Sequence, residues 1–364
     1  MHENDLSQLL MLTLSELRWN SSLENTLHRL HPGGVLVDAP LHDGAENCRE
    51  FLFKAASSVP TVPFLAVREE GGLMDPLQAF LPHLPSPRAA AGKGRACVER
   101  LGDRVGAALQ LLGFNTVFAP LLDLAPSNPN PGTGTPWRAP TETRTFSADP
   151  QQVAKCGEAF LEGLKAHKVL ACGKHFPGLG GARPAGATDV PLVSKSMAEL
   201  WCEDLVPYRA LLTRLPLILV STAAYKAYDF DLLQSACLSS KVVEGLLRVK
   251  LGYEGVAIAC GLETEAVRGA LRLEEAAVQA VGAGCDMLLA EEGEVAERVR
   301  EALSAALESG KLPGTRVEQA LKRIQLAKRG LRPTVGKLSR GSLDKLIKQF
   351  TVFSAGFTGA EDRD

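Results

Sequence analysis

Short apolar runs alternate with amphipathic stretches along most of the chain. The apolar runs lie at 9–14, 34–38, 62–67, 116–122, 169–174, 217–222, 255–260 and 286–290. Stretches with helical spacing lie at 22–30, 45–56, 97–112, 150–166, 197–212, 239–251, 265–283 and 294–307. This order predicts parallel strands that are buried on both faces. The sequence thus contains eight strand–helix units, and eight is the number that closes a barrel. We therefore predict an α/β fold, a (β/α)8 TIM-type barrel in a single domain. An open doubly wound sheet is the alternative architecture.

Two stretches interrupt this rhythm. Residues 125–143 form a loop rich in Pro, Asn and Gly that includes Trp137, and we expect a functional rim there because so long a loop is uncommon in a compact domain. A basic helix is expected at 314–331, and periodicity is lost after it. We therefore assign residues 1–331 to the barrel and 332–364 to a C-terminal tail that packs loosely or frays.

Composition narrows the classes of partner. The chain has 364 residues, 45% of them hydrophobic, and 40 basic residues nearly balance 42 acidic ones. No long-range field therefore attracts nucleic acid or an anionic membrane, and a neutral small molecule fits better. The eight cysteines include no CxxC pair, and the histidines form no metal-ligand pattern, so we expect reduced core thiols, no metal and no cofactor.

The N-terminal region gives an expectation about location. The apolar run at 9–14 is too short for a signal peptide or a membrane span. We expect a soluble, cytoplasmic protein that is a monomer or a weak homodimer.

The segment VLACGKHFPGLGG at 169–181 is the centre of the functional interpretation. It is an apolar strand that ends in Lys174 and His175 and then breaks into a Pro/Gly turn. Polar residues on a buried run need partners or ligands. In a barrel they share the carboxyl-terminal face with the residues after the other strands, namely Arg68, Glu69, Glu70, Asp123, Thr222, Cys260, Gly261, Glu291 and Glu292. Convergent donors of this kind suit a polyhydroxylated ligand, although each side chain taken singly is also typical of a solvated rim.

These residues carry a resemblance to a known family. KHFPGLGG (174–181) resembles the Lys-His-Phe-Pro-Gly-His-Gly signature of family 3 glycoside hydrolases, in the β-N-acetylglucosaminidase branch. Further similar segments are AVREEGG (66–72), FAPLLDL (118–124), TRTFSADP (143–150), LSSKVVEGLLRVKLGYEGVAI (238–258) and AGCDMLL (283–289), so the resemblance extends to about Leu331. It implies a retaining hydrolase that removes β-linked N-acetylglucosamine. Such enzymes use a carboxylate nucleophile and, in this branch, a His–Asp pair as the acid.

When the family's motifs are aligned with this sequence position by position, the positions of the catalytic residues hold other residue types. Ala185, Gly186 and Ala187 stand where the family has Asp, Ser and His, and Cys260 stands at the nucleophile position. Other substrate-contact positions differ as well, with Arg68, Leu73, Leu179 and Thr222 in place of Asp, Arg, His and His. The residues that resemble the sugar ligands are Arg144, Lys174 and His175, joined by Asp123.

Several functions follow from this pattern. Loss of acid–base help alone costs roughly 10²–10⁴ in rate, so the ordinary mechanism should not run, and the leading hypothesis is a non-catalytic amino-sugar-binding or regulatory homologue. An active retaining glycosidase that uses Asp189 or Glu263 is one alternative. A lyase with a Schiff base on Lys174 is another, and a structural role at a protein interface is a third. Cys260 has no neighbouring base in the sequence, which favours a passive thiol.

Overall fold

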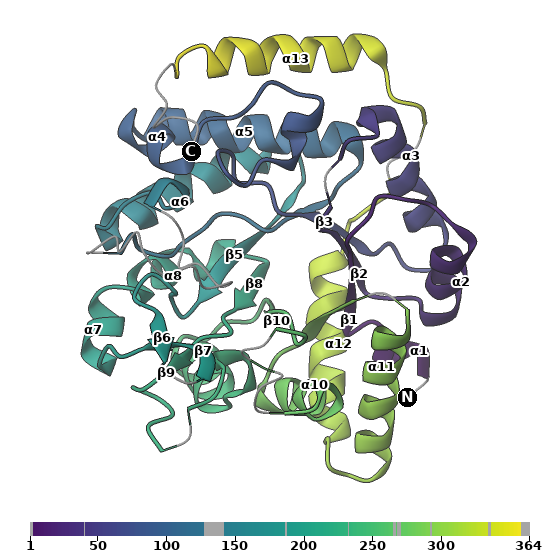
Figure 1. The fold of residues 1–364 in the computed structure, drawn as a ribbon, viewed down its shortest axis with the longest axis vertical. Coiled ribbons are helices and arrows are strands. Elements are labelled where there is room, and N and C mark those ends of the chain that lie inside the picture. Colours follow the sequence, from purple (N-terminus) through teal and green to yellow (C-terminus); the bar gives the residue numbers. More distant parts are fainter. Residues whose placement is uncertain are drawn as a thin grey trace.

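A closed barrel of parallel strands forms the centre of the protein (Figure 1). The computed structural model describes residues 3–39, 41–126, 142–185, 188–231, 233–264, 267, 271–291, 293–333 and 336–357. The strand order in the barrel is β1-β11-β10-β8-β5-β4-β3-β2. The strands are β1 (Leu10–Leu14), β2 (Gly34–Val37), β3 (Phe64–Val67), β4 (Thr116–Val117), β5 (Leu170–Phe176), β8 (Leu217–Val220), β10 (Val256–Ala259) and β11 (Met287–Glu291). The predicted (β/α)8 barrel is confirmed, and each strand lies within or overlaps a predicted apolar run.

The barrel closes because its strands are apolar on both faces. Every residue of β2, β3, β8 and β10 is buried. Closure comes from β1, which pairs in parallel with β11 through Leu10 and Leu288 and with β2 through Met11 and Gly34. Lys174 on β5 is a charged residue within this largely apolar interior, with an exposed fraction of 1%.

Helices surround the barrel (Figure 1). They are α1 (Glu3–Ser7), α2 (Ser21–Leu30), α3 (Gly44–Ser57), α4 (Pro87–Gly92), α5 (Arg95–Leu112), α6 (Pro150–Lys165), α7 (Met197–Cys202), α8 (Leu205–Leu211), α10 (Leu273–Ala283), α11 (Glu294–Glu308), α12 (Gly314–Lys328) and α13 (Arg340–Ser354). Short 3-10 turns are η1 (Pro76–Ala79), η2 (Glu142–Arg144), η3 (Leu212–Arg214) and η4 (Ala236–Leu238). Glycines let α5 and α6 touch closely, because a Cβ on Gly102 would lie 2.3 Å from the Phe160 carbonyl oxygen and one on Gly163 2.1 Å from that of Glu99.

Some predicted helices differ in detail. The stretch 197–212 divides into α7 and α8, and Pro207 gives a physical reason because it has no N–H to continue the α7 hydrogen-bond ladder. The stretch 239–251 contains a π-helix, η5 (Lys241–Lys250), and the described helix within 265–283 begins at Leu273. The loop after β5 also contains β6 (Arg183–Ala185) and β7 (Thr188–Val193), which form a small sheet with β9 (Ala224–Tyr225) that the sequence did not predict.

For residues 336–357, the prediction that the tail packs loosely or frays was wrong. Helix α13 lies along α5 in Figure 1. Phe350 is fully buried and Leu346 and Phe357 nearly so. The hydroxyl of Ser354 donates to the carbonyl oxygen of His83 over 2.6 Å, and the Lys93 ammonium lies 4.2 Å from the ring centre of Phe357. Burial of these apolar side chains fixes the helix to the barrel.

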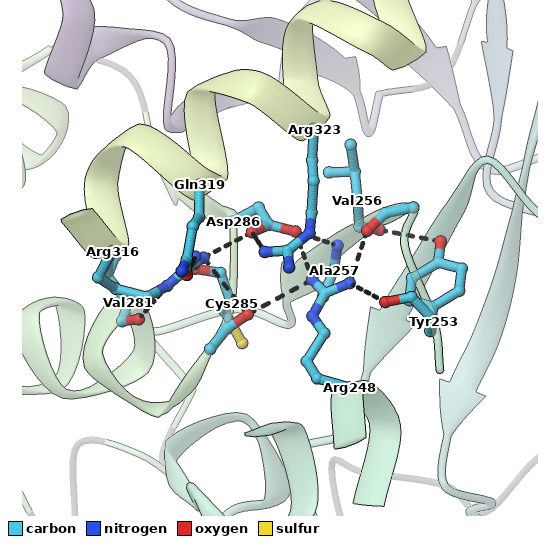
Figure 2. Close-up of polar contacts among 12 residues, drawn as sticks. Arg248, Tyr253, Val256, Ala257, Val281, Cys285, Asp286, Arg316, Gln319 and Arg323 are labelled. Carbon is cyan, nitrogen blue, oxygen red and sulfur yellow. Dashed lines mark hydrogen bonds and ion pairs between the residues drawn. The ribbon is translucent and has the colours of Figure 1, made fainter. Parts of the chain in front are cut away.

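A buried ionic cluster joins β10 and β11 to the outer helices (Figure 2). Asp286, directly before β11, is fully buried and accepts from the Ala257 amide over 3.0 Å. Its carboxylate also pairs with Arg248 of η5, with Arg316 of α12 at 2.5 Å and with Arg323 of α12 at 3.2 Å. One carboxylate therefore neutralises part of the charge of three guanidinium groups, which secures the helices to the barrel wall.

Candidate functional site

Glu70 is the centre of a buried ionic cluster at the carboxyl end of β3. The Arg144 guanidinium donates to it through two parallel hydrogen bonds, Nε to Oε2 at 3.0 Å and Nη2 to Oε1 at 2.8 Å. The ammonium of Lys174 also pairs with Oε1, and the Glu70 and Lys174 side chains are each 1% exposed. Burial opposes the ionisation of Glu70, but the charges of Lys174 and Arg144 outweigh it and lower the pKa of Glu70 to about 2.

This cluster depends on contacts that are far apart in the sequence. Arg144 ends the turn η2 and reaches a carboxylate 74 residues earlier. Lys174 lies on β5, where it pairs with Leu219 of the neighbouring strand β8. Burial lowers the pKa of Lys174, as does the nearby positive charge of Arg144, while Glu70 opposes the change. The two cations share one anion and present N–H donors next to one another.

His175 and Asp123 form a hydrogen-bonded pair beside the Glu70 cluster. The Nδ1 atom of His175 is 2.8 Å from Asp123 Oδ2, and the backbone amides of His175 and Leu179 donate to Asp123 Oδ1 over 3.2 Å and 2.7 Å. Burial lowers the pKa of His175 despite the neighbouring carboxylate. The neutral ring therefore donates from Nδ1 to Asp123 and keeps Nε2 as an acceptor.

Cys260 follows β10 directly and belongs to the same end of the barrel. Burial raises the pKa of its thiol, although Arg68 and Lys174 lie close enough for their positive charges to oppose this change. Arg68 is itself paired with Asp38. The thiol form is thus favoured over the thiolate.

A cavity of about 390 Å³ lies next to this cluster, at the carboxyl ends of β2 and β3. Leu73 and Met74 form part of its apolar wall, and its polar lining residues are Asp38, His42, Arg68, Asp75 and Gln78. Arg68 connects the cavity to the cluster, since its charge acts on both Lys174 and Cys260. The volume and the mixed lining suit a small polar ligand.

Glu263 and Asp189 are the two carboxylates that were considered as replacements for the family's catalytic groups, and the structure describes the side chain of Glu263 only. Glu263 accepts a hydrogen bond from the Glu291 amide over 3.1 Å, so its carboxylate is held at the end of β11. Asp189 belongs to β7, but its side chain lies outside the described part of the structure. Among the family acid positions, Ala185 ends β6, while Gly186 and Ala187, like Trp137, lie outside the described residues.

Sequence reasoning missed the central role of Glu70. It appeared only as one of several residues after a strand end, and the feature that singles it out is its position three residues after β3, where it pairs with two cations. Glu69 was missed as well. It is fully buried and accepts from the Gly71 amide over 2.8 Å, and burial together with the nearby charge of Asp75 raises its pKa well above the usual value.

The described residues of the cluster provide hydrogen-bond donors and acceptors of the kind that ligand hydroxyls need. Glu70 and Asp123 are both held by cationic or backbone donors. In the described residues, no group of three or more His, Cys, Asp or Glu side chains is placed to hold a metal ion. None of the helices described is long and apolar enough to cross a bilayer.

A closed (β/α)8 barrel with a polar cluster at the carboxyl ends of its strands defines the class: a TIM-type barrel with its candidate site at that face. The sequence profile of the Glycosyl hydrolase family 3 N terminal domain matches residues 1–327. The chain therefore belongs to glycosyl hydrolase family 3, as its motifs predicted.

Individual relatives agree with this assignment. The chain is 31% identical over 264 residues to a beta-hexosaminidase of Pseudomonas aeruginosa, covering 71% of this chain and 75% of that protein. The crystal structure of the beta-N-acetylglucosaminidase from Thermotoga maritima has a TM-score of 0.78 and 26% identity, with coverage of 90% and 68%. A fungal multi-domain GH3 beta-N-acetylglucosaminidase has a TM-score of 0.86 at 23% identity, and the chain covers 43% of it, which shows the shared fold alone.

Proposed function

We propose that this protein binds an amino sugar of the N-acetylglucosamine type at the barrel mouth without hydrolysing it. The observation that carries the proposal is Cys260, a thiol with a raised pKa at the end of β10, where the family resemblance implies a carboxylate nucleophile. A thiol that stays protonated does not attack an anomeric carbon. The binding half of the site is built independently of this position.

The retained polar cluster supports sugar binding. Lys174 and His175 lie on β5, and Arg144 lies on a turn that is tied to Lys174 through Glu70. The donors of Lys174 and Arg144 and the Nε2 acceptor of His175 are therefore positioned before a ligand arrives. Fixed donors and acceptors of this kind suit sugar hydroxyls, because little side-chain entropy is lost on binding. The relatives described above are hexosaminidases, which supports an amino sugar as the ligand class.

Three of the described carboxylates at this face have other partners. Glu70 and Asp123 carry the binding cluster, and Glu263 is engaged with the amide of Glu291. A retaining glycosidase needs two carboxyl groups about 5–5.5 Å apart across the scissile bond. For Lys174, the ion pair with Glu70 favours a role as a hydrogen-bond donor over that of a free amine for Schiff-base chemistry.

Calorimetric titration with N-acetylglucosamine tests the binding function. We expect saturable binding to the unmodified protein and at least tenfold weaker binding to Arg144→Met, because hydrogen bonds to charged groups contribute about 1.5–3 kcal/mol each. Arg95→Met is the matched control, since Arg95 lies on α5 and pairs with Glu158 on the outside of the barrel. Absence of saturable binding, or equal losses in both variants, would contradict the proposal.

A further inference from the structure

A second cavity lies at the opposite end of the barrel from the candidate site. Its volume is about 630 Å³. Asp5 and Gln8 line it from the segment before β1, residues 60–62 from the segment before β3, and Leu321 to Arg332 from the end of α12 and the turn after it. The cavity therefore opens at the amino ends of the strands, whereas Lys174 and His175 lie at the carboxyl ends.

A buried lysine forms part of the cavity wall. Lys328, the last residue of α12, is 8% exposed, and its Nζ donates to Gln8 Oε1 over 2.9 Å. Gln8 is fixed in turn, because its Nε2 donates to the His31 carbonyl oxygen over 2.6 Å. The ammonium lies 5.2 Å from the ring centre of Phe64. The acceptor is a neutral amide, so this hydrogen bond brings no negative charge to the ammonium.

Burial changes the acidity of the Lys328 ammonium. The loss of surrounding water lowers the pKa of Lys328 to about 7. An anion in the cavity would reverse that effect, because an opposite charge nearby favours the protonated amine. The cavity therefore holds a cationic group whose charged form gains from a bound anion.

Further cationic side chains line the same cavity. Arg329 and Arg332 follow Lys328 closely in the sequence and are exposed, and Asp5 is the acidic residue of the lining. Guanidinium groups bind phosphate oxygens through paired N–H donors, while an ammonium acts as a point charge. Ile324 and Leu331 add an apolar wall, so the lining matches a molecule with an anionic group and a larger uncharged body.

We propose that this cavity is a binding site for a small organic phosphate, with Lys328, Arg329 and Arg332 holding the phosphate group. A phosphate monoester carries close to two negative charges at neutral pH, which matches the three cations better than a single carboxylate does. The cavity volume leaves room for a sugar-sized body beside the phosphate. The site shares no lining residue with the cluster at the barrel mouth, so its ligand does not compete with an amino sugar.

Calorimetric titration of the full chain at pH 7 with glucose 6-phosphate, inorganic phosphate and glucose tests the proposal. We expect saturable binding of glucose 6-phosphate, weaker binding of inorganic phosphate and none of glucose. Lys328→Met should weaken the binding of glucose 6-phosphate at least tenfold. Lys322→Met, an exposed lysine on the same helix that lies outside the cavity lining, should leave it unchanged.

A second variant keeps the test decisive if Lys328→Met fails to fold. Arg332→Ala changes an exposed side chain, so the fold should be kept while binding of glucose 6-phosphate falls several-fold. Three results would overturn the proposal: no binding to the unmodified chain, equal binding to Arg332→Ala and the unmodified chain, or binding of inorganic phosphate as tight as that of glucose 6-phosphate. The last result would mean an adventitious ion only.

Discussion

The Glu70 ion cluster predicts a specific dependence of stability on pH. On folding, the pKa of Glu70 falls from 4.5 to about 2. At about 1.4 kcal/mol for each pKa unit, this carboxylate contributes about 3 kcal/mol to the free energy of unfolding at neutral pH. Because the folded-state pKa is lowered, the contribution is complete above pH 4.5 and is lost as the pH falls toward 2.

Glu70→Gln removes this contribution and leaves Lys174 and Arg144 buried without their shared counter-ion. Urea unfolding of the unmodified protein and the variant should therefore differ by about 3 kcal/mol at pH 7 and by about half that or less at pH 3. The refuting result is a difference below about 1 kcal/mol at pH 7, or one that does not shrink on acidification.

Glu69→Gln is the matched control, because it changes the adjacent buried glutamate. The pKa of Glu69 is raised, so its contribution to stability is present at low pH and is lost as the pH rises through the folded-state pKa. We expect this variant to keep or gain stability at pH 7. A loss as large as that of Glu70→Gln would show that the effect belongs to any carboxylate at this strand end.

Three further predictions concern the rest of the molecule. Asp286→Asn should lower the free energy of unfolding by about 3–5 kcal/mol in urea titrations, because it leaves three guanidinium groups without their carboxylate. Phe350→Ala should cost about 3–5 kcal/mol in the same measurement if α13 is part of the fold, while Val352→Ala, exposed on the same helix, should stay within about 0.5 kcal/mol. Iodoacetamide should alkylate the exposed Cys202 well before Cys260, and mass spectrometry that finds the reverse order would contradict the passive thiol.

The barrel could be predicted from local patterns because each strand is a short apolar run buried on both faces. Runs such as those of β2 and β8 carry this signal without reference to any other part of the chain. Helix α13 was missed although Leu343, Leu346, Ile347 and Phe350 follow helical spacing, and its contact with α5 makes Phe350 a core residue. The small sheet of β6, β7 and β9 depends likewise on pairing between segments rather than on strong local preference.

The candidate site was predictable only in part. Lys174 and His175 could be identified because polar residues on an apolar strand need partners, and the structure supplies Glu70 and Asp123. The identity of those partners could not be read from the sequence, since the ion pairs span long separations such as the 74 residues between Glu70 and Arg144. The same reason hid the Asp286 cluster, whose cations come from two different helices.

The separation of sugar binding from bond cleavage is tested most directly with 4-nitrophenyl N-acetyl-β-D-glucosaminide. Its leaving group departs without protonation, so the assay depends on a nucleophile rather than on a general acid. The account predicts nitrophenol release no faster than in buffer at concentrations where N-acetylglucosamine binding is measurable. Release that is faster than in buffer and is lost in Glu263→Gln or Asp189→Asn would contradict it.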